Sequence, residues 1–330
     1  MVEKNANEAN SEFTVPERLN GERLDRAAAQ LATGLSRARL KRAIEGGAVR
    51  VNGKRRPKGA TVATGDVIAI DTTQVSDADS PAEATPDEPL LVGFEGEGVL
   101  VVDKPAGQPT APLRAGETGA LANALVGRYP ELAGIGYSAR EPGLVHRLDT
   151  DTSGLVLVAR TKEAFEVLRA ALKEDRIEKR YLLLCASADL PDEGSIEFPI
   201  ANHPKDQRRV YPCIHPRDVM RYAPRPASTF YRVVQRGSPW ALVEVTVSRA
   251  LRHQIRAHFA AIDHPLAGDV LYGGAEIRSL GRHALHASRI AFTGAPGVAK
   301  FDVTSPLPPA MASLVTVTAD SPDAPEIEQT

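Results

Sequence analysis

Gly143-Leu-Val-His146-Arg147-Leu148-Asp149-Thr150-Asp151-Thr152-Ser153-Gly154 is followed directly by the apolar run Leu155–Ala159. The apolar run has the length of a buried strand, and the loop before it is dense in aspartate, threonine, serine and glycine. Such side chains bond to nearby backbone, so a loop of this kind can hold a carboxylate rigidly at the surface of a cleft. Read alone, the segment leaves open whether Asp149 or Asp151 does chemistry or merely caps a turn.

The segments around this loop predict an α+β domain with a mainly antiparallel sheet. Apolar runs predict strands at Val99–Val102, Leu155–Ala159 and Tyr181–Cys185, and clean alternation predicts another at Ala241–Ser248. Helical spacing predicts helices at Leu121–Leu125, Ala164–Leu172 and His253–Ile262. Strands that pair as hairpins, with helices segregated from them, are typical of this class.

The composition predicts an ordinary globular protein. The chain has 330 residues, of which 42% are hydrophobic and 25% charged, with a formal net charge of -2. Its two cysteines, Cys185 and Cys213, have no spacing typical of a disulfide framework or zinc site. The first ten residues lack the apolar core of a signal peptide, and no apolar run approaches the length of a membrane span. We therefore expect a soluble, monomeric, cytoplasmic protein with no membrane partner.

Shifts in composition predict two domains. Residues 1–15 are polar and are expected to be disordered, and a compact domain is expected at 16–71. Residues 72–89 hold five acids, three prolines and no basic residue, which is typical of a linker. The large domain is expected at 90–317, followed by an acidic tail at 318–330.

The small domain contains a dense cluster of basic residues. Helical spacing and the tight-turn pair Asn52-Gly53 predict a compact α/β unit. The stretch from residue 37 to residue 58 contains nine basic residues and one acidic residue. Its local charge is therefore +8, in a chain whose net charge is -2. Such a patch suits a phosphate backbone, although a solvated basic face is the alternative. The candidate RNA-binding residues are Arg37, Arg39, Lys41, Arg42, Arg50, Lys54 and Arg55.

The order of these elements resembles the S-four RNA-binding domain. The resemblance rests on Arg23-Leu24-Asp25, Leu35-Ser36-Arg37, Val49-Arg50-Val51-Asn52-Gly53-Lys54 and Gly65-Asp66. It implies a module that grips structured RNA by shape and backbone, and it implies no chemistry.

The large domain resembles the RluA-like family of pseudouridine synthases from about Leu90 to Pro309. The signature is His146-Arg147-Leu148-Asp149, and other family segments accompany it in order. They are Asp103-Lys104-Pro105-Ala106-Gly107, Lys179-Arg180-Tyr181, Ala227-Ser228-Thr229, His253-Gln254-Ile255-Arg256-Ala257-His258, His264-Pro265-Leu266-Ala267-Gly268-Asp269, Tyr272-Gly273 and Leu285-His286-Ala287.

The resemblance implies that Asp149 is the catalytic carboxylate. The family cleaves the glycosidic bond of uridine, rotates the uracil and rejoins it through a ring carbon. No atoms or electrons are gained, so neither a cofactor nor a metal is expected. A carboxylate can act as nucleophile at the sugar or as base toward its neighbouring carbon, and the sequence leaves both open.

Four further residues are implied to serve the substrate. Arg256 keeps the aspartate ionised and oriented, because a neighbouring cation lowers a carboxyl pKa. Ile255 packs on the target base and Tyr181 stacks on it. The uridine must leave its stack to reach the aspartate, and Arg147 helps to fill the vacated place.

Several alternatives remain at this level. The usual Thr-Gly-Arg-Thr of the family is replaced by Ser248-Arg249-Ala250-Leu251-Arg252, which leaves the shape of this loop open. Ribosomal RNA of the large subunit is the favoured substrate and transfer RNA the second. A non-catalytic RNA-binding assembly factor is the alternative from another class. The pairs Cys213/His215 and His283/His286 form no recognised metal ligand set, and no Gly-x-Ser-x-Gly elbow of a hydrolase is present.

Overall fold

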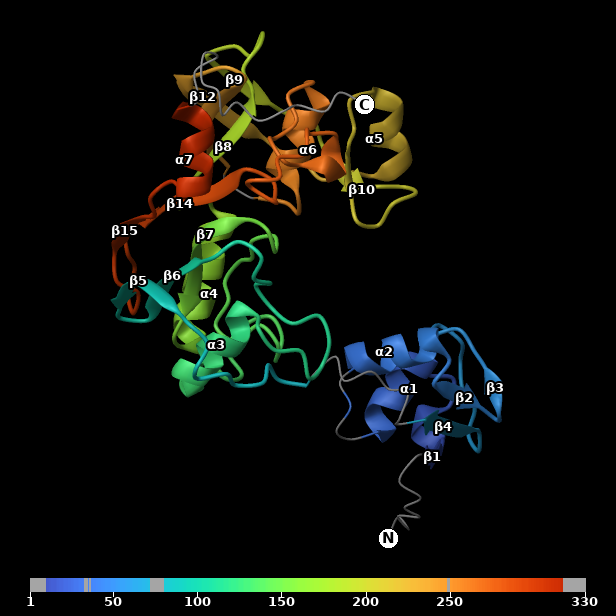
Figure 1. Ribbon diagram of the computed structural model, residues 1–330. Coiled ribbons are helices and arrows are strands. Elements are labelled where there is room, and N and C mark those ends of the chain that lie inside the picture. Colours follow the sequence, from blue (N-terminus) through green and yellow to red (C-terminus); the bar gives the residue numbers. More distant parts are fainter. Residues whose placement is uncertain (1–9, 33–34, 36, 72–79, 248–249, 317–330) are drawn as a thin grey trace. The chain divides into compact units, whose positions relative to one another are not determined.

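The computed structural model describes residues 10–32, 35, 37–71, 80–247 and 250–316, except for the side chains of 10, 37–39, 42 and 316. The chain divides into two compact units, Met1–Pro81 and Ala82–Thr330 (Figure 1). Each unit has its own apolar core. The predicted tail at 318–330 and residues 72–79 of the predicted linker lie outside the described residues.

Unit 1 is a four-stranded sheet, in the order β1-β4-β2-β3, with two helices. Its core holds Leu24, Leu40, Ile68 and Ile70, all fully buried. The elements are β1 (Asn10–Thr14), η1 (Glu17–Leu19), α1 (Leu24–Leu31), α2 (Arg37–Gly46), β2 (Val49–Val51), β3 (Lys54–Arg55) and β4 (Val67–Asp71).

The expectation of disorder was wrong for residues 10–14. They form β1, which pairs antiparallel with β4 and places Phe13 opposite Ile68. An edge strand is held by backbone hydrogen bonds, which a polar sequence supplies as well as an apolar one. Phe13 also packs on the core, so a single apolar side chain anchors the strand.

The predicted turn at Asn52-Gly53 is confirmed. Both residues have positive φ, 49° and 74°, as the tightest hairpin turn requires. Asn52 further accepts the backbone N–H of Val67 at 2.8 Å and donates to Asp66 at 2.8 Å, which ties the turn to β4.

Unit 2 is built on one nine-stranded mixed sheet. The path runs β5-β6-β7-β14-β8-β13-β12-β9, and β15 pairs with β14. Neighbouring strands pair antiparallel, except for β7 with β14, which are parallel. The strands are β5 (Leu91–Gly96), β6 (Val99–Lys104), β7 (Ser153–Ala159), β8 (Ile177–Ala186), β9 (Glu193–Ile196), β12 (Thr229–Arg236), β13 (Trp240–Thr246), β14 (Leu285–Phe292) and β15 (Phe301–Thr304). The predicted α+β class with a mainly antiparallel sheet is confirmed.

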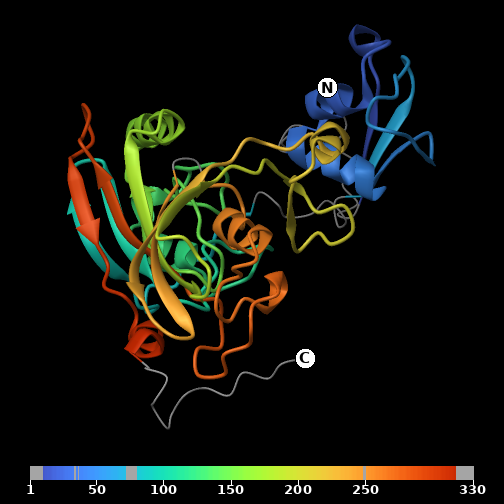
Figure 2. The same ribbon diagram turned by 90° about the horizontal axis from the view of Figure 1, so that it is seen from above.

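Helices cover this sheet at several points. In Figure 1, α4 (Lys162–Lys173) lies against β7. In addition, α7 (Pro309–Thr316) contacts β13, and α6 (Gln254–Ala261) contacts β12. A two-stranded ribbon and α5 extend away from the large sheet, as Figure 2 shows. The remaining elements are α3 (Leu121–Arg128), η2 (Pro130–Leu132), α4 (Lys162–Lys173), β10 (Ile200–Asn202), β11 (Val210–Pro212), α5 (Pro216–Tyr222), α6 (Gln254–Ala261), η3 (Val270–Tyr272) and α7 (Pro309–Thr316).

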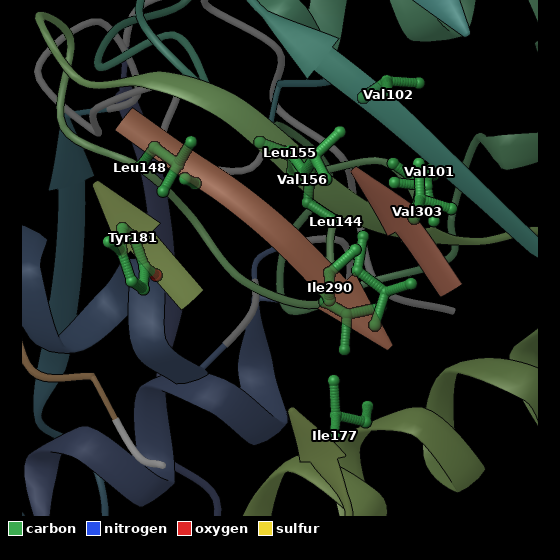
Figure 3. Close-up of a cluster of buried hydrophobic side chains, with 14 of the residues drawn as sticks. Val101, Val102, Leu144, Leu148, Leu155, Val156, Ile177, Tyr181, Ile290 and Val303 are labelled. Atoms are coloured by element: carbon green, nitrogen blue, oxygen red, sulfur yellow. The ribbon is translucent and has the colours of Figure 1, made fainter. Parts of the chain in front are cut away.

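The core of unit 2 reaches from the outer strands to the loop after Val145. Figure 3 shows Val101 and Val303 at one end of the apolar cluster and Leu148 with Tyr181 at the other. All seven residues of β7 are buried, in agreement with the continuous apolar run in the sequence. The aspartate-rich loop therefore begins against the core, since Leu148 beside Asp149 belongs to the cluster.

The second half of the predicted linker belongs to unit 2. Ala82 is buried in its core, and Asn123 donates to the backbone oxygen of Glu83 at 2.7 Å. The backbone of Thr85 also bonds to that of Asn123. Low apolar content led us to predict a free linker here, but a buried asparagine supplies hydrogen bonds that hold the polar chain in place.

Candidate active site

The loop that carries Asp149 is fastened at both ends. Lys104 is fully buried at the end of β6, and its Nζ donates to the backbone oxygens of Pro105, Gln108 and Thr150 at 2.7–2.9 Å. Burial lowers the pKa of Lys104 to about 8. Thr110 clamps the other side, because its hydroxyl donates to the carbonyl of Leu148 at 2.7 Å and accepts the N–H of the same residue at 3.2 Å.

Gly154 is required where this loop becomes β7. Its φ of +111° is unfavourable for other residues, and a Cβ there would lie 2.3 Å from the carbonyl oxygen of Ala287. The close approach accompanies the parallel pairing of β7 with β14. The glycine therefore allows the strand that follows the loop to enter the sheet.

A buried arginine holds the Asp149 carboxylate. Arg256 on α6 donates from Nη1 to Oδ2 of Asp149 at 3.0 Å. Its Nε and Nη2 donate to the two oxygens of Asp269 at 2.7 and 2.8 Å. The side chains of Arg256 and Asp269 are 7% and 1% exposed, against 24% for Asp149. Asp269 thus fixes the guanidinium of Arg256, whose third nitrogen, Nη1, donates to the partly exposed carboxylate of Asp149.

His253 approaches the same carboxylate oxygen from another side. Its Nε2 lies 3.6 Å from Oδ2 of Asp149, and its Nδ1 lies 3.1 Å from the hydroxyl of Tyr272. That hydroxyl accepts the backbone N–H of Val210 at 2.8 Å. Burial lowers the pKa of His253, and the charge of Asp149 opposes this shift.

All five residues expected to handle the target base line one small cavity of about 50 Å³. They are Asp149, Arg147, Tyr181, Ile255 and Arg256. Asp149, Arg147 and Tyr181 also line an adjoining open cavity of about 990 Å³. Tyr181 is 5% exposed, and burial followed by the charge of Asp149 raises the pKa of its phenol. Arg147 is the most exposed of the five, with 63% of its side chain accessible and an ion pair to Glu141 at 3.2 Å.

Three histidines bond to the loop or to the strand that follows it. His146 accepts the backbone N–H of Leu157 at its Nε2, and burial with the charge of Lys179 lowers its pKa to about 3. His283 lies 2.8 Å from the hydroxyl of Thr152, and burial lowers its pKa to about 2. His286 contacts Ser153 and the backbone of Ser305. Among the residues that the structure describes, no group of three or more histidine, cysteine or acidic side chains is arranged to hold a metal.

The described part of the basic patch in unit 1 faces solvent. The side chains of Lys41, Arg50, Lys54 and Arg55 are exposed. Arg50 and Arg55 stand directly opposite each other in the β2–β3 pair, and like charges in that position repel. A polyanion would relieve this repulsion. The side chains of the other predicted RNA-binding residues, Arg37, Arg39 and Arg42, lie outside the described residues.

The atypical loop is described in part. Ser248 and Arg249 lie outside the described residues. Arg252 donates to the backbone oxygens of Gln207 and Arg209 at 2.6 and 3.0 Å, which ties this loop to the segment before β11.

Sequence reasoning missed three residues of the site. Asp269, His253 and Lys179 all lie within segments that carried the family resemblance, but none had been given a role. For Lys179 a signal existed, since it precedes Tyr181 by two residues on a strand and so shares its face. For Asp269 and His253 no local pattern indicated contact with Arg256 or Asp149.

Comparison with known proteins places both units. The model of the family described as RNA pseudouridylate synthase matches residues 98–261, and that of the S4 domain matches residues 22–68. The chain is 34% identical to ribosomal large subunit pseudouridine synthase D of Nitrosomonas europaea, over 96% of this chain and 90% of that protein. Its identity to the protein of the same name from Yersinia pestis is 34%, over 84% and 85%.

Solved structures show the same fold. Human RNA pseudouridylate synthase domain containing 1 has a TM-score of 0.54 at 23% identity, and covers 74% of this chain and 91% of its own. Its counterpart, domain containing 4, has a TM-score of 0.51 at 20% identity, over 67% and 90%. Within the described ranges, no helix is both long and apolar enough to cross a membrane.

Proposed function

Because the chain belongs to the RNA pseudouridylate synthase family, we propose that it converts specific uridines of large-subunit ribosomal RNA to pseudouridine, with Asp149 as the catalytic carboxylate. Family membership makes the chain an RNA-modifying isomerase and favours this reading over that of a non-catalytic assembly factor. The choice of ribosomal RNA over transfer RNA is supported by the names of the two bacterial relatives and by the S4 domain.

The contact between Asp149 and Arg256 carries the assignment of Asp149. The Asp149 carboxylate is partly exposed to a large cavity and accepts a hydrogen bond from buried Arg256, whose charge Asp269 already balances. An ionised carboxylate held in this way has an oxygen free to attack the sugar or to remove a proton from it. No redox or group-transfer partner is needed, because the product is an isomer of the substrate.

The other residues take roles around the flipped base. The uridine leaves its stack and enters the cavity, where the ring of Tyr181 stacks on it and Ile255 packs against it. Arg147, exposed beside Asp149, fills the place that the base vacates. The basic face of unit 1 contributes sequence-independent affinity for structured RNA. We propose a cytoplasmic monomer that works without a metal or cofactor.

The test uses the full chain and its Asp149→Asn variant on unmodified ribosomal RNA and transfer RNA. Pseudouridines are mapped by carbodiimide labelling and primer-extension stops. We expect new stops in large-subunit RNA with the unaltered chain, a loss of at least about 10³-fold in rate with the variant, and similar RNA affinity for both. Stops in transfer RNA alone would reassign the substrate. Equal turnover by Asp149→Asn and the unaltered chain would contradict the catalytic role of the aspartate. Tight binding to RNA without stops on either RNA would favour a non-catalytic assembly factor.

A further inference from the structure

A buried lysine beside the candidate active site has no ion-pair partner among the residues that the structure describes. Lys179 lies on β8, two residues before Tyr181, and is 6% exposed. It makes no side-chain hydrogen bond or ion pair with any residue that the structure describes. Burial disfavours the charged form and lowers the pKa of Lys179 to about 8, whereas the charge of Asp175 acts in the opposite direction. The burial of Lys179 without an ion-pair partner among the described residues therefore suggests a functional role.

Lys179 lies at the junction of two cavities. It lines the 990 Å³ cavity that holds Asp149 and Tyr181, and it also lines a second cavity of about 500 Å³. The two cavities share Tyr137, His146, Ala250 and Leu251 in their linings. A ligand seated at Asp149 can therefore continue past Lys179 into the second cavity.

The second cavity is positively charged. Its two acids are already engaged, since Glu166 pairs with Arg169 at 2.5 Å and Glu174 pairs with Arg176 at 2.8 Å. At its exposed rim, Lys173 and Arg225 make no side-chain ion pair within the described residues.

Among the described residues, those that line both cavities together with Lys179 include no acid. Burial and the charge of Lys179 keep His146 neutral, and burial raises the pKa of the Tyr137 phenol. Lys173, Lys179 and Arg225 thus add three positive charges to a lining whose two acids, Glu166 and Glu174, already pair with arginines.

We propose that this cavity is a phosphate site, in which Lys179 at the floor and Lys173 and Arg225 at the rim hold the RNA backbone next to the target uridine. Residues 179 and 181 point to the same face of β8, with Cα atoms about 7 Å apart. A base stacked on Tyr181 brings its own phosphodiester within the reach of Lys179, because a flipped nucleotide remains joined to its strand. Binding there would resist the return of the base to its stack.

The experiment measures how RNA affinity depends on salt, using the full chain and an unmodified large-subunit ribosomal RNA transcript. The variants are Lys179→Met, which keeps the volume but removes the charge, and Lys179→Arg, which keeps the charge. Lys162→Gln is the matched control, because Lys162 is exposed at the opposite end of α4 from Lys173 and outside both linings.

Between about 50 and 200 mM salt, we expect Lys179→Met to flatten the plot of log affinity against log salt by 0.7–0.9, the loss of one phosphate contact. Its KM should rise about tenfold while kcat changes far less. Lys179→Arg should recover most of the slope, and Lys162→Gln should match the unaltered chain. Thermal unfolding midpoints of all variants show that affinity is not lost through unfolding.

Free phosphate is the other source of the same chemistry. Millimolar inorganic phosphate, compared with potassium chloride at equal ionic strength, should inhibit the unaltered chain and Lys179→Met alike if only the polymer backbone binds. Selective inhibition of the unaltered chain, without a change of salt slope in Lys179→Met, would show a site for free phosphate instead and overturn the proposal.

The proposal is also overturned if Lys179→Met keeps the salt slope, whatever happens to kcat, since Lys179 would then act by positioning Tyr181. The inference rests on the proposed action on ribosomal RNA, and the two fail separately. A transcript that gains no pseudouridine from the unaltered chain speaks against the substrate, whereas the salt slope still tests Lys179.

Discussion

Arg256 holds Asp149, which lies 107 residues earlier in the chain, by a single hydrogen bond of 3.0 Å from Nη1. The rest of the guanidinium is bound in parallel by Asp269. Rotation of Arg256 away from Asp149 would break two buried charge-assisted hydrogen bonds. The orientation of the Asp149 carboxylate is therefore set with the help of Asp269, an acid that does not line the small cavity around Asp149.

The paired hydrogen bonds between Asp269 and Arg256, here called the clamp, predict that Asp269→Asn lowers the stability of the chain. The change leaves the positive charge of Arg256 buried with half its compensation, which costs about 3 kcal/mol of unfolding free energy. Urea denaturation measures this loss, and pseudouridine formation should fall with it even where the variant is folded. Glu141→Gln is the control, because its partner Arg147 is largely exposed and such pairs contribute at most about 1 kcal/mol. Equal stability of Asp269→Asn and the unaltered chain would contradict the clamp.

The protonation state of Tyr181 predicts the alkaline side of the pH profile. Burial and the charge of Asp149 raise the pKa of this phenol, so it keeps its proton to above pH 10, the ordinary value for tyrosine. Tyr181→Phe should turn over more slowly, yet its profile should run parallel to that of the unaltered chain from pH 7 to about 10. Single-turnover rates on one RNA measure both profiles. A decline on the alkaline side that disappears in Tyr181→Phe would show that the phenol titrates in this range.

Lys179 predicts a pH-dependent stability difference. Below the folded pKa of about 8, the lysine is charged in both the folded and unfolded chain, and the cost of burial is present in full. Between pH 8 and 10.5, the ordinary pKa of lysine, the unfolded chain binds more protons than the folded chain, so stability rises with pH. Lys179→Met should therefore be more stable by up to about 3 kcal/mol at pH 7, and this advantage should shrink toward pH 10. Urea denaturation across this range tests the trend, which a constant difference would contradict.

The basic hairpin of unit 1 predicts a change in RNA binding without a loss of stability. The double variant Arg50→Gln/Arg55→Gln removes two like charges that face each other, so the free energy of unfolding should stay equal or rise slightly. Its salt slope for RNA binding should flatten by about 1.4–1.8 if both side chains contact phosphate.

The control for the hairpin is Arg18→Gln/Arg26→Gln, which removes the same charge from exposed positions outside the patch. Filter binding at several salt concentrations gives the slopes. If the two double variants behave alike, the net charge of the unit matters and the hairpin has no special role.

Much of this protein is encoded locally and could be predicted from its sequence. Alternation and apolar runs predicted β6, β7 and β13, because burial of one strand face imposes a period that needs no knowledge of the partner strand. Asn52-Gly53 predicted its hairpin, because few residues tolerate positive φ. Asp149, Tyr181 and Arg256 were found through short family segments, and they line the same cavity.

Only the tertiary structure decided the contacts between segments that lie far apart in the sequence. A polar stretch became β1 only because β4 offered a free edge, and half of the expected linker was captured by Asn123. Asp269 and His253 reach Arg256 and Asp149 through the packing of α6 and the loop after it, which no sequence period records. The isolation of Lys179 is likewise a property of its surroundings, since a lysine in a sequence is charged and solvated until the fold removes its water. Local periodicity thus determined the elements, and short family segments gave the candidate catalytic residues, whereas long-range packing decided which of the described charges are paired.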